Sequence, residues 1–326
     1  MSRPTFPSYN SMPTQNLQNS PEVGSLVNPW VRAARPETLT AAVVPVVVGT
    51  AVAAMENIRL GLGAELHFER MLLALVSACA IQVGTNYFND AIDFCRGADT
   101  TNRLGPPRAT QLGLLTAQQM MRGAWAAFFL AVITGAVLVA MCGPVILAIG
   151  LLSLLFGYAY TGGPFPLAYR GLGDVFVLLF FGIVAVMGST YLQLASWPSS
   201  SLLAGIQVGL LAVVLIAINN FRDSEGDRMA RKYTLAVLLG EKIARYEIVV
   251  AAVLPFILGF GWLLHDALWA AVLPLAALPL LGKVIGGAGR LAPSAACNGL
   301  LVTSAKMHAL FGALLAAGLL LSALWR

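Results

Sequence analysis

The sequence predicts an all-α membrane protein with many spans arranged around a central cavity. Of its 326 residues, 58% are hydrophobic and only 11% are charged, and the mean hydropathy is +0.78. Such a composition excludes a water-soluble domain in which each element has one apolar face. The apolar stretches are unbroken and reach the roughly 20 residues that a helix needs to cross a bilayer, so helices rather than strands are predicted.

Nine such stretches follow one another along the chain, and residues 29–326 are predicted to form one transmembrane domain. The stretches are centred near Val46, Val76, Leu130, Leu152, Phe180, Leu211, Phe256, Leu273 and Leu315. Residues 1–28 are polar and rich in Ser, Pro, Asn and Gln, so they predict a disordered tail. No cleavable signal peptide is visible in this tail.

The distribution of Lys and Arg predicts the orientation, because basic residues are retained on the cytoplasmic side. With the N-terminus inside, seventeen of the twenty basic residues fall in cytoplasmic segments. Only Arg59, Arg70 and Arg326 fall outside. The C-terminus is therefore predicted to lie on the outer side.

Five of the seven aspartates fall in two short clusters on the predicted cytoplasmic side. Asp90, Asp93 and Asp99 follow the second apolar stretch, and Asp223 and Asp227 follow the sixth. Carboxylates near a membrane helix are costly, so a partner or a water-filled cavity should compensate them. Four spans separate the clusters, which predicts two similar four-helix units plus one extra helix, with both clusters facing one cavity.

The chemistry of the clusters indicates a metal-diphosphate site. Asn86, Asp90 and Asp93 are spaced i, i+4, i+7, and Asn220, Asp223 and Asp227 are spaced i, i+3, i+7, so each set is expected on one helix face. Oxygen ligands favour Mg²⁺, which binds through one or two carboxylates plus substrate phosphates. Basic side chains that suit phosphate oxygens lie nearby: Arg103, Arg108, Arg222, Arg228 and Lys232.

Other functions would use some of these features. One acidic cluster alone is typical of a solvated loop or a helix cap, but two clusters matched in spacing favour a paired site. A secondary transporter also has intramembrane acids and repeats, yet it would place the acids nearer mid-span. A non-catalytic quinone-binding protein would have no need of five mutually repelling carboxylates. The four cysteines and three histidines are scattered, so neither a disulfide nor a histidine metal site is expected.

Several motifs resemble the UbiA superfamily of intramembrane prenyltransferases. The sequence NDxxD at 89–93 with GAD at 97–99 resembles its first signature, and DxxxD at 223–227 resembles the second. Within that superfamily, the resemblance is to enzymes that prenylate 1,4-dihydroxy-2-naphthoate in menaquinone or phylloquinone biosynthesis. The segments that carry this narrower resemblance are 34–40, 103–116, 160–174 and 219–240. The chain departs from the pattern at Ala91, where tyrosine is common, and at Arg231, where glycine is expected.

The resemblance implies site residues and a reaction. It implies an Mg²⁺-dependent transferase that joins a polyprenyl group from polyprenyl diphosphate to 1,4-dihydroxy-2-naphthoate, with loss of CO₂ and diphosphate. Homogentisate and 4-hydroxybenzoate are the alternative acceptors. The sequence does not indicate the prenyl chain length or the oligomeric state. No nucleic-acid partner is expected. A bacterial inner membrane with a cytoplasmic active face is the expected location. The implied metal ligands are Asp90, Asp93, Asp99, Asp223, Asp227 and Asn89; of these, Asp90, Asp93, Asp223 and Asp227 are catalytic candidates together with Tyr160. Tyr160 would act by its ring face or by contact with the acceptor, or would belong to the interfacial aromatic belt. Asn86, Asn219, Asn220 and Asp174 are candidates for supporting the metal ligands or binding the acceptor, and Asp174 is alternatively a helix cap.

The paired-cluster hypothesis predicts that Asp90→Ala and Asp223→Ala each abolish turnover while the protein still folds in the membrane. Each change removes a carboxylate from a site that needs both clusters to hold the metal-diphosphate group. Diphosphate release would be measured in membranes at matched expression levels. Normal turnover in either variant would contradict a site shared by the two clusters.

Overall fold

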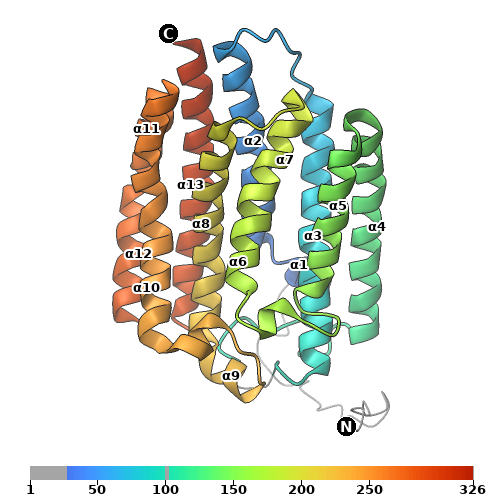
Figure 1. Ribbon diagram of the computed structural model, residues 1–326. Coiled ribbons are helices and arrows are strands. Elements are labelled where there is room, and N and C mark those ends of the chain that lie inside the picture. Colours follow the sequence, from blue (N-terminus) through green and yellow to red (C-terminus); the bar gives the residue numbers. More distant parts are fainter. Residues whose placement is uncertain (1–27, 100–102, 326) are drawn as a thin grey trace.

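The structure is a computed structural model that describes residues 28–99 and 103–325. Every regular element in these two segments is helical (Figure 1). The predicted all-α membrane fold is confirmed. The predicted N-terminal tail lies outside the described residues except for Asn28.

All nine predicted apolar stretches form helices, and eight of them in the described segments are long and apolar enough to cross a membrane. Single helices form five of these spans: α2 (Thr40–Arg59), α3 (Phe68–Cys95), α4 (Ala117–Cys142), α8 (Ser199–Arg222) and α13 (Cys297–Leu324). Three spans are composite: α6 (Gly173–Val177) continues through a π-helical stretch into α7 (Ala185–Leu194), α10 (Leu235–Leu258) continues as a 3₁₀ helix to His265, and α11 (Leu268–Val272) continues into α12 (Leu278–Arg290). The ninth, α5 (Pro144–Ala159), has 16 residues and is only about 24 Å long at 1.5 Å per residue.

The helices stand side by side in two groups, with the α6–α7 span between them (Figure 1). One group contains α2, α8, α10 and α13, whose buried side chains form the larger hydrophobic core. In the other group α3 packs along α4 and α5. Alanine, valine and other compact residues dominate the larger core, as expected where membrane helices approach closely.

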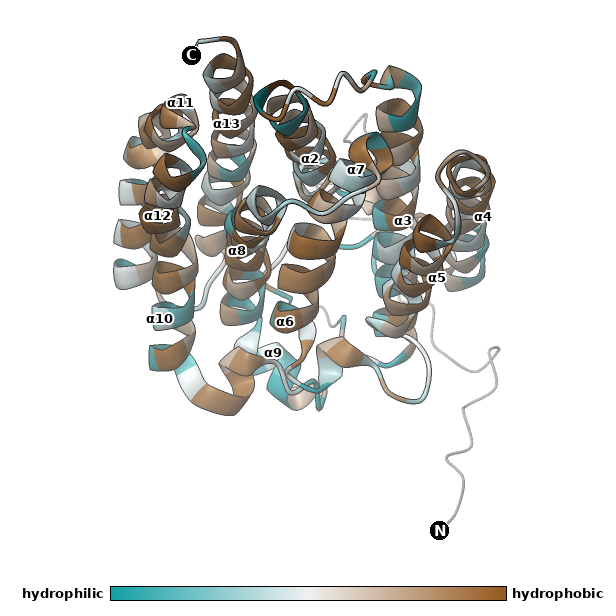
Figure 2. Ribbon diagram, turned by 45° about the horizontal axis from the view of Figure 1, so that its top comes forward, coloured by the Kyte–Doolittle hydropathy of each residue, from teal (hydrophilic) through white to brown (hydrophobic). Residues whose placement is uncertain are grey.

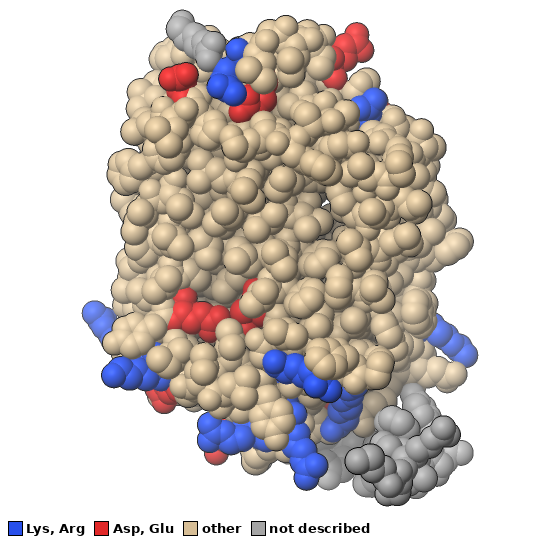
Figure 3. Space-filling view, viewed as in Figure 1, with Lys and Arg blue, Asp and Glu red and all other residues tan. Residues whose placement is uncertain are grey.

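Polar residues concentrate at the end of the bundle that carries the short helix α9 (Ser224–Met229), whereas the helices are hydrophobic along most of their length (Figure 2). Basic side chains gather at the same end, and a broad uncharged band separates them from the opposite end (Figure 3). The C-terminal ends of α2 and α13 meet at that opposite end, where Arg59 and Ser322 line one small pocket. The start of α2 and the end of α13 therefore lie on opposite sides of the bundle.

Glycines allow the composite span α6–α7 to contact α8 closely. A Cβ atom on Gly182 would lie 2.4 Å from the carbonyl oxygen of Gly205 and 2.4 Å from Cα of Gly209. Both atoms belong to backbone, so no side-chain rotation can relieve the overlap. This close approach fixes the position of the α6–α7 span against α8.

The glycine contact predicts that Gly182→Ala destabilises the protein by about 1–3 kcal/mol, the usual range for overpacking. Gly286→Ala is the matched control, because a Cβ there meets nothing within 4 Å. Unfolding of the two purified variants would be compared by thermal denaturation in detergent. Equal stability of the Gly182 and Gly286 variants would show that the helices can separate without penalty.

Candidate active site

Helix α3 carries the first acidic cluster on one buried face. Asn86, Asp90 and Asp93 are 4%, 1% and 3% exposed, which agrees with the predicted helical spacing. The helix ends in a glycine-containing turn: Gly97 has φ +72°, its N–H donates to the Phe94 carbonyl at 3.0 Å, and the next N–H donates to the Asp93 carbonyl at 2.9 Å. This Schellman-type ending reverses the chain.

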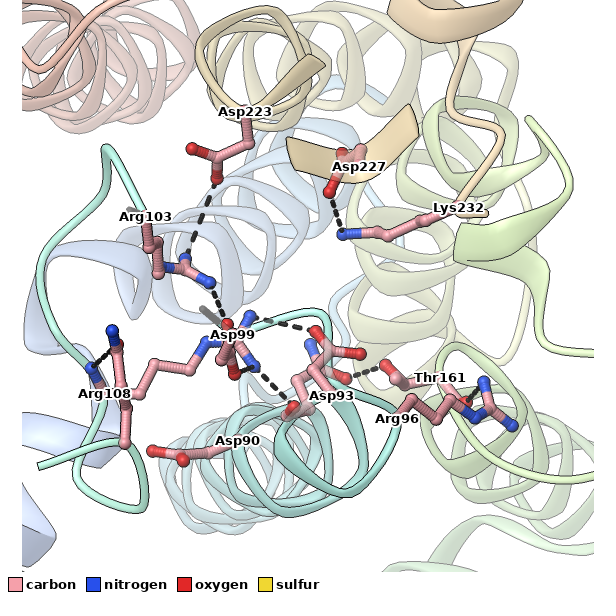
Figure 4. Close-up of polar contacts among 12 residues, drawn as sticks. Asp90, Asp93, Arg96, Asp99, Arg103, Arg108, Thr161, Asp223, Asp227 and Lys232 are labelled. Carbon is pink, nitrogen blue, oxygen red and sulfur yellow. Dashed lines mark hydrogen bonds and ion pairs between the residues drawn. The ribbon is translucent and has the colours of Figure 1, made fainter. Parts of the chain in front are cut away.

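Arg108 joins the two carboxylates that this turn brings together. Its Nη2 lies 3.0 Å from Oδ2 of Asp93, and its Nη1 lies 3.0 Å from Oδ2 of Asp99. The same Nη1 donates to the Asn89 carbonyl at 2.5 Å. Burial disfavours the charged guanidinium, but the charges of Asp99, Asp93 and Asp90 outweigh it and raise the pKa of Arg108 above its ordinary value. Figure 4 shows this network.

Asp90 has a different set of partners from the other aspartates. Its carboxylate accepts hydrogen bonds from the backbone N–H of Ala109 at 3.2 Å and of Thr110 at 3.3 Å, and also from the Thr110 hydroxyl. These bonds attach the loop that follows Arg108 to helix α3. Asp90 therefore positions Arg108 in addition to contributing negative charge.

The second cluster lies where two helices meet. Helix α8 ends at Arg222 and α9 begins at Ser224, with Asp223 between them at φ −92°, ψ 6°. The expected single helix face for Asn220, Asp223 and Asp227 is therefore shared by two helices, because the backbone leaves regular α geometry at Asp223.

Arg222 donates two hydrogen bonds to the Asp223 carboxylate, from Nε to Oδ1 at 2.8 Å and from Nη2 to Oδ2 at 2.7 Å. Arg222 is itself held by Oδ1 of Asn298 at 2.7 Å. Burial opposes ionisation of Asp223, but the hydrogen bonds from Arg222 and the charges of Arg222 and Arg103 outweigh it and lower its pKa. Asp223 is thus an anion in the folded protein.

Arg103 connects the two clusters. It forms an ion pair with Asp99, and its Nη2 lies 3.7 Å from Oδ2 of Asp223 (Figure 4). Residues more than 100 positions apart in the sequence therefore contact one guanidinium. The structure brings together five predicted residues here: Asp93, Asp99, Arg103, Arg108 and Asp223.

Asp227 and Lys232 form the edge of this network, with Nζ of Lys232 3.4 Å from Oδ1 of Asp227. The other Asp227 oxygen, Oδ2, is buried and has no hydrogen-bond partner among the described residues. Burial is the main cause that raises the pKa of this carboxyl, although Lys232 opposes the shift. An unpartnered buried oxygen beside a second carboxylate is a suitable ligand for a cation.

Tyr169 is a site residue that the sequence argument missed. Its hydroxyl donates to Oδ1 of Asp93 at 2.8 Å, and Arg96 and Lys232 lie over its ring at 4.7 and 5.9 Å from the centroid. Burial and the neighbouring Asp93 raise the pKa of Tyr169, so the hydroxyl stays protonated and able to donate. Its only sequence signal was its position within the 160–174 segment.

An apolar cavity of about 480 Å³ lies beside the polar network, between α2, α3, α4, α5, the α6–α7 span and α8. Exposed side chains such as Leu147 and Leu151 line one part of it, so the cavity opens toward the surface that faces lipid. Tyr160 lies at its polar end, at the C-terminus of α5. The other polar residues at this end are Arg35, Thr38, Gln82, Thr85, Asn86, Asn89 and Asn219.

Three predicted residues, Arg228, Asp174 and Asn220, lie apart from the network. Arg228 is exposed and forms no ion pair in the described part of the chain. Asp174 is 4% exposed and accepts a hydrogen bond from Nδ2 of Asn220 at 3.4 Å, while its Oδ2 has no partner among the described residues. Asp174 and Asn220 thus form a separate pair beside the site.

The donor atoms fit a hard cation that brings its own phosphate ligands. Within residues 28–99 and 103–325, no three His, Cys, Asp or Glu side chains already converge on one metal position. Arg103 and Arg108 each lie between two of the carboxylates. Mg²⁺ needs fewer than three protein ligands, since it uses one or two carboxylates plus substrate phosphates. All available ligands are oxygens, which is the type Mg²⁺ prefers.

The fold and the site together define an integral membrane protein whose buried carboxylates and arginines adjoin a lipid-facing apolar cavity. Residues 42–290 match the UbiA prenyltransferase family, and the chain belongs to that family. It is 37% identical to 1,4-dihydroxy-2-naphthoate octaprenyltransferase of Escherichia coli strain K12 over 264 residues, 78% of this chain and 82% of the relative.

Two further comparisons agree with this assignment. The enzyme of the same name from Mycobacterium tuberculosis is 37% identical over 233 residues, 70% of this chain and 77% of the relative. Among solved structures, a UbiA homolog from Archaeoglobus fulgidus bound to DMAPP and Mg²⁺ superposes with a TM-score of 0.56 at 16% identity, covering 88% of this chain and 99% of that one. The last similarity concerns the fold alone.

The Tyr169 contact predicts that Tyr169→Phe lowers turnover about tenfold, the loss expected when a hydrogen bond to a charged group is removed. The ring remains, so its contacts with Arg96 and Lys232 remain too. Tyr246→Phe is the matched control because Tyr246 is 57% exposed. Diphosphate release by the two variants would be compared at equal protein concentration, and unchanged turnover of the Tyr169 variant would remove this hydroxyl from the site.

Proposed function

We propose that the chain transfers a polyprenyl group from polyprenyl diphosphate to 1,4-dihydroxy-2-naphthoate and releases CO₂ and diphosphate. The observation that carries this proposal is Arg103, which contacts carboxylates of both motifs directly beside a lipid-facing cavity. A charged diphosphate and an apolar tail are the two parts that such a combination would bind. The acceptor is inferred from the relatives named above.

The polar network would bind the diphosphate. Asp93, Asp99, Asp223 and Asp227 would hold Mg²⁺, with Asn89 as a further oxygen donor and Asp90 holding the loop. When bound, Mg²⁺ would neutralise charge on the diphosphate and so favour its departure. Arginines offer bidentate hydrogen bonds to phosphate oxygens. The diphosphate ligands in this proposal are Arg103, Arg108, Arg222 and Lys232, while the exposed Arg228 contributes charge at longer range.

The apolar cavity would bind the prenyl chain and protect the reaction from water. The C–O bond to diphosphate breaks with its electron pair on the leaving group, and the allylic cation that remains would react with water if it were exposed. Tyr160 at the polar end of the cavity can stabilise positive charge through its ring face. Because the cavity opens toward lipid, a long tail can extend beyond it into the bilayer.

The acceptor ring then attacks the allylic carbon through the ring carbon that bears the carboxylate. The new C–C bond forms with electrons of the ring. The bond to the carboxylate then breaks, its electron pair restores the aromatic ring, and CO₂ leaves. Asn219 and Asn86, which line the same end of the cavity, are suited to orient the two ring oxygens.

We also propose that the active site faces the cytoplasm of a bacterial inner membrane, with the start of α2 inside and the end of α13 outside. The concentration of basic side chains at the α9 end supports this orientation (Figure 3). The proposal of two similar four-helix units draws support from the placement of the motifs, since each follows the end of a long helix, α3 and α8.

The proposed reaction predicts Mg²⁺-dependent prenyl transfer to 1,4-dihydroxy-2-naphthoate with one CO₂ released per product. Purified protein would be given geranylgeranyl or longer diphosphates, with 4-hydroxybenzoate and homogentisate as competing acceptors. Lipid quinol and CO₂ would be followed with and without EDTA. Transfer to another ring would move the protein to another branch of the family, and no transfer to any ring would contradict the proposal.

A further inference from the structure

Arg35 is a cavity residue that the reaction scheme above does not use. It follows α1 (Pro29–Ala34) and has a left-handed backbone conformation, φ 51° and ψ 71°. A residue other than glycine in this conformation costs about 1 kcal/mol or more. Such a residue persists only where its surroundings hold it in place.

Helix α3 provides that support. Nδ2 of Asn86 donates to the carbonyl of Ala34 at 2.9 Å and to Oγ1 of Thr38 at 3.1 Å. The Thr38 hydroxyl in turn donates to the carbonyl of Arg35 at 2.9 Å. The residues on both sides of Arg35 are therefore attached to the helix that carries the first acidic cluster.

The Arg35 guanidinium has no protein counterion within contact distance. Its Nη2 is buried without a hydrogen-bond partner, and no ion pair to Arg35 occurs in the described residues. The neighbouring Arg103 and Arg108 both have carboxylate partners. Burial is the main cause that lowers the pKa of Arg35 to about 10, with the charges of Arg108 and Arg103 acting in the same direction; the side chain is still a cation at neutral pH.

Arg35 also differs from the other basic residues in where it points. Among the described residues it is the only Lys or Arg that lines the apolar cavity. The arginines of the polar network do not line it. Arg35 therefore offers a positive charge to a molecule inside the cavity.

We propose that Arg35 binds the carboxylate of the aromatic acceptor and positions the acceptor for attack. This inference rests on the proposed function. The ring carbon that attacks also bears the carboxylate, so the carboxylate must lie within a few ångströms of the first prenyl carbon when the new bond forms. A cation on the cavity wall near its polar end can meet it there, and a guanidinium matches a carboxylate with two parallel hydrogen bonds.

The same contact explains how the acceptor is oriented before it loses CO₂. Arg35 holds an anion in the ground state, and the group that finally leaves is neutral CO₂, so the interaction ends when the C–C bond breaks. Arg35 is thus a positioning residue whose effect should appear mainly in acceptor affinity. Acceptors without a carboxylate should gain nothing from it.

The test compares Arg35→Gln and Arg35→Lys with wild type. Arg32→Gln is the matched control, because Arg32 is an arginine three residues earlier, on α1, that does not line the cavity. For each full-length protein in detergent, KM is measured for 1,4-dihydroxy-2-naphthoate and for geranylgeranyl diphosphate. Binding of the naphthoate and of carboxylate-free 1,4-naphthalenediol is measured by calorimetry with Mg²⁺ and a non-reactive thiolodiphosphate analogue present. Thermal denaturation reports whether each variant is folded.

Arg35→Gln is expected to weaken naphthoate binding about tenfold or more, the usual effect of losing a charge-assisted pair. Geranylgeranyl diphosphate KM and naphthalenediol binding should change less than twofold, and Arg35→Lys should fall between Gln and wild type. A rise in diphosphate KM with naphthoate binding unchanged would overturn the proposal and assign Arg35 to the leaving group. If Arg35→Gln weakened the binding of 1,4-dihydroxy-2-naphthoate and of 1,4-naphthalenediol equally, Arg35 would have a structural role only, and the proposal would be wrong.

Failure of the proposed function would look different. If wild type transfers the prenyl group to another aromatic acid, the acceptor assignment is wrong, and Arg35 is tested against that acid and its decarboxylated analogue in the same way. If wild type uses only acceptors without a carboxylate, the Arg35 proposal fails as well.

Discussion

The structure depends on arginines that neutralise buried carboxylates at one end of the membrane bundle. Asp93 and Asp99 each contact Arg108, and Asp99 and Asp223 each contact Arg103. An uncompensated carboxylate in such surroundings would be protonated or would destabilise the fold. Since Arg103 touches both motifs, the same ion pairs that make the charges tolerable also hold the ends of α3 and α8 together.

The paired charges suggest how substrate binding proceeds without exposing bare charge. A diphosphate competes with the carboxylates for the arginines, and a divalent cation competes with the arginines for the carboxylates. If both enter together, each buried group exchanges one partner of opposite charge for another. We infer that metal and diphosphate bind as a unit, because either alone would leave part of the network unpaired.

The sequence predicted the membrane fold and the acidic clusters well because both depend on composition and local spacing. Helical spacing on α3 placed Asn86, Asp90 and Asp93 on one buried face, as the structure confirms. The helical spacing could not show that α8 ends at Arg222 and that a new helix begins after Asp223, because nothing in the local sequence marks this break. Tyr169 escaped notice because its hydroxyl contacts the distant Asp93, and Arg35 escaped notice because only the folded bundle places it on the cavity wall.

Arg231 shows how a departure from a family pattern can be judged by backbone geometry. The expected residue was glycine, and the structure gives Arg231 a positive φ of 55°, a conformation that glycine adopts freely. The side chain is exposed, so the departure carries a local backbone cost of about 1 kcal/mol without changing the buried network. Lys232, the next residue, still reaches Asp227, and the turn therefore keeps its function of bringing a cation to the second motif.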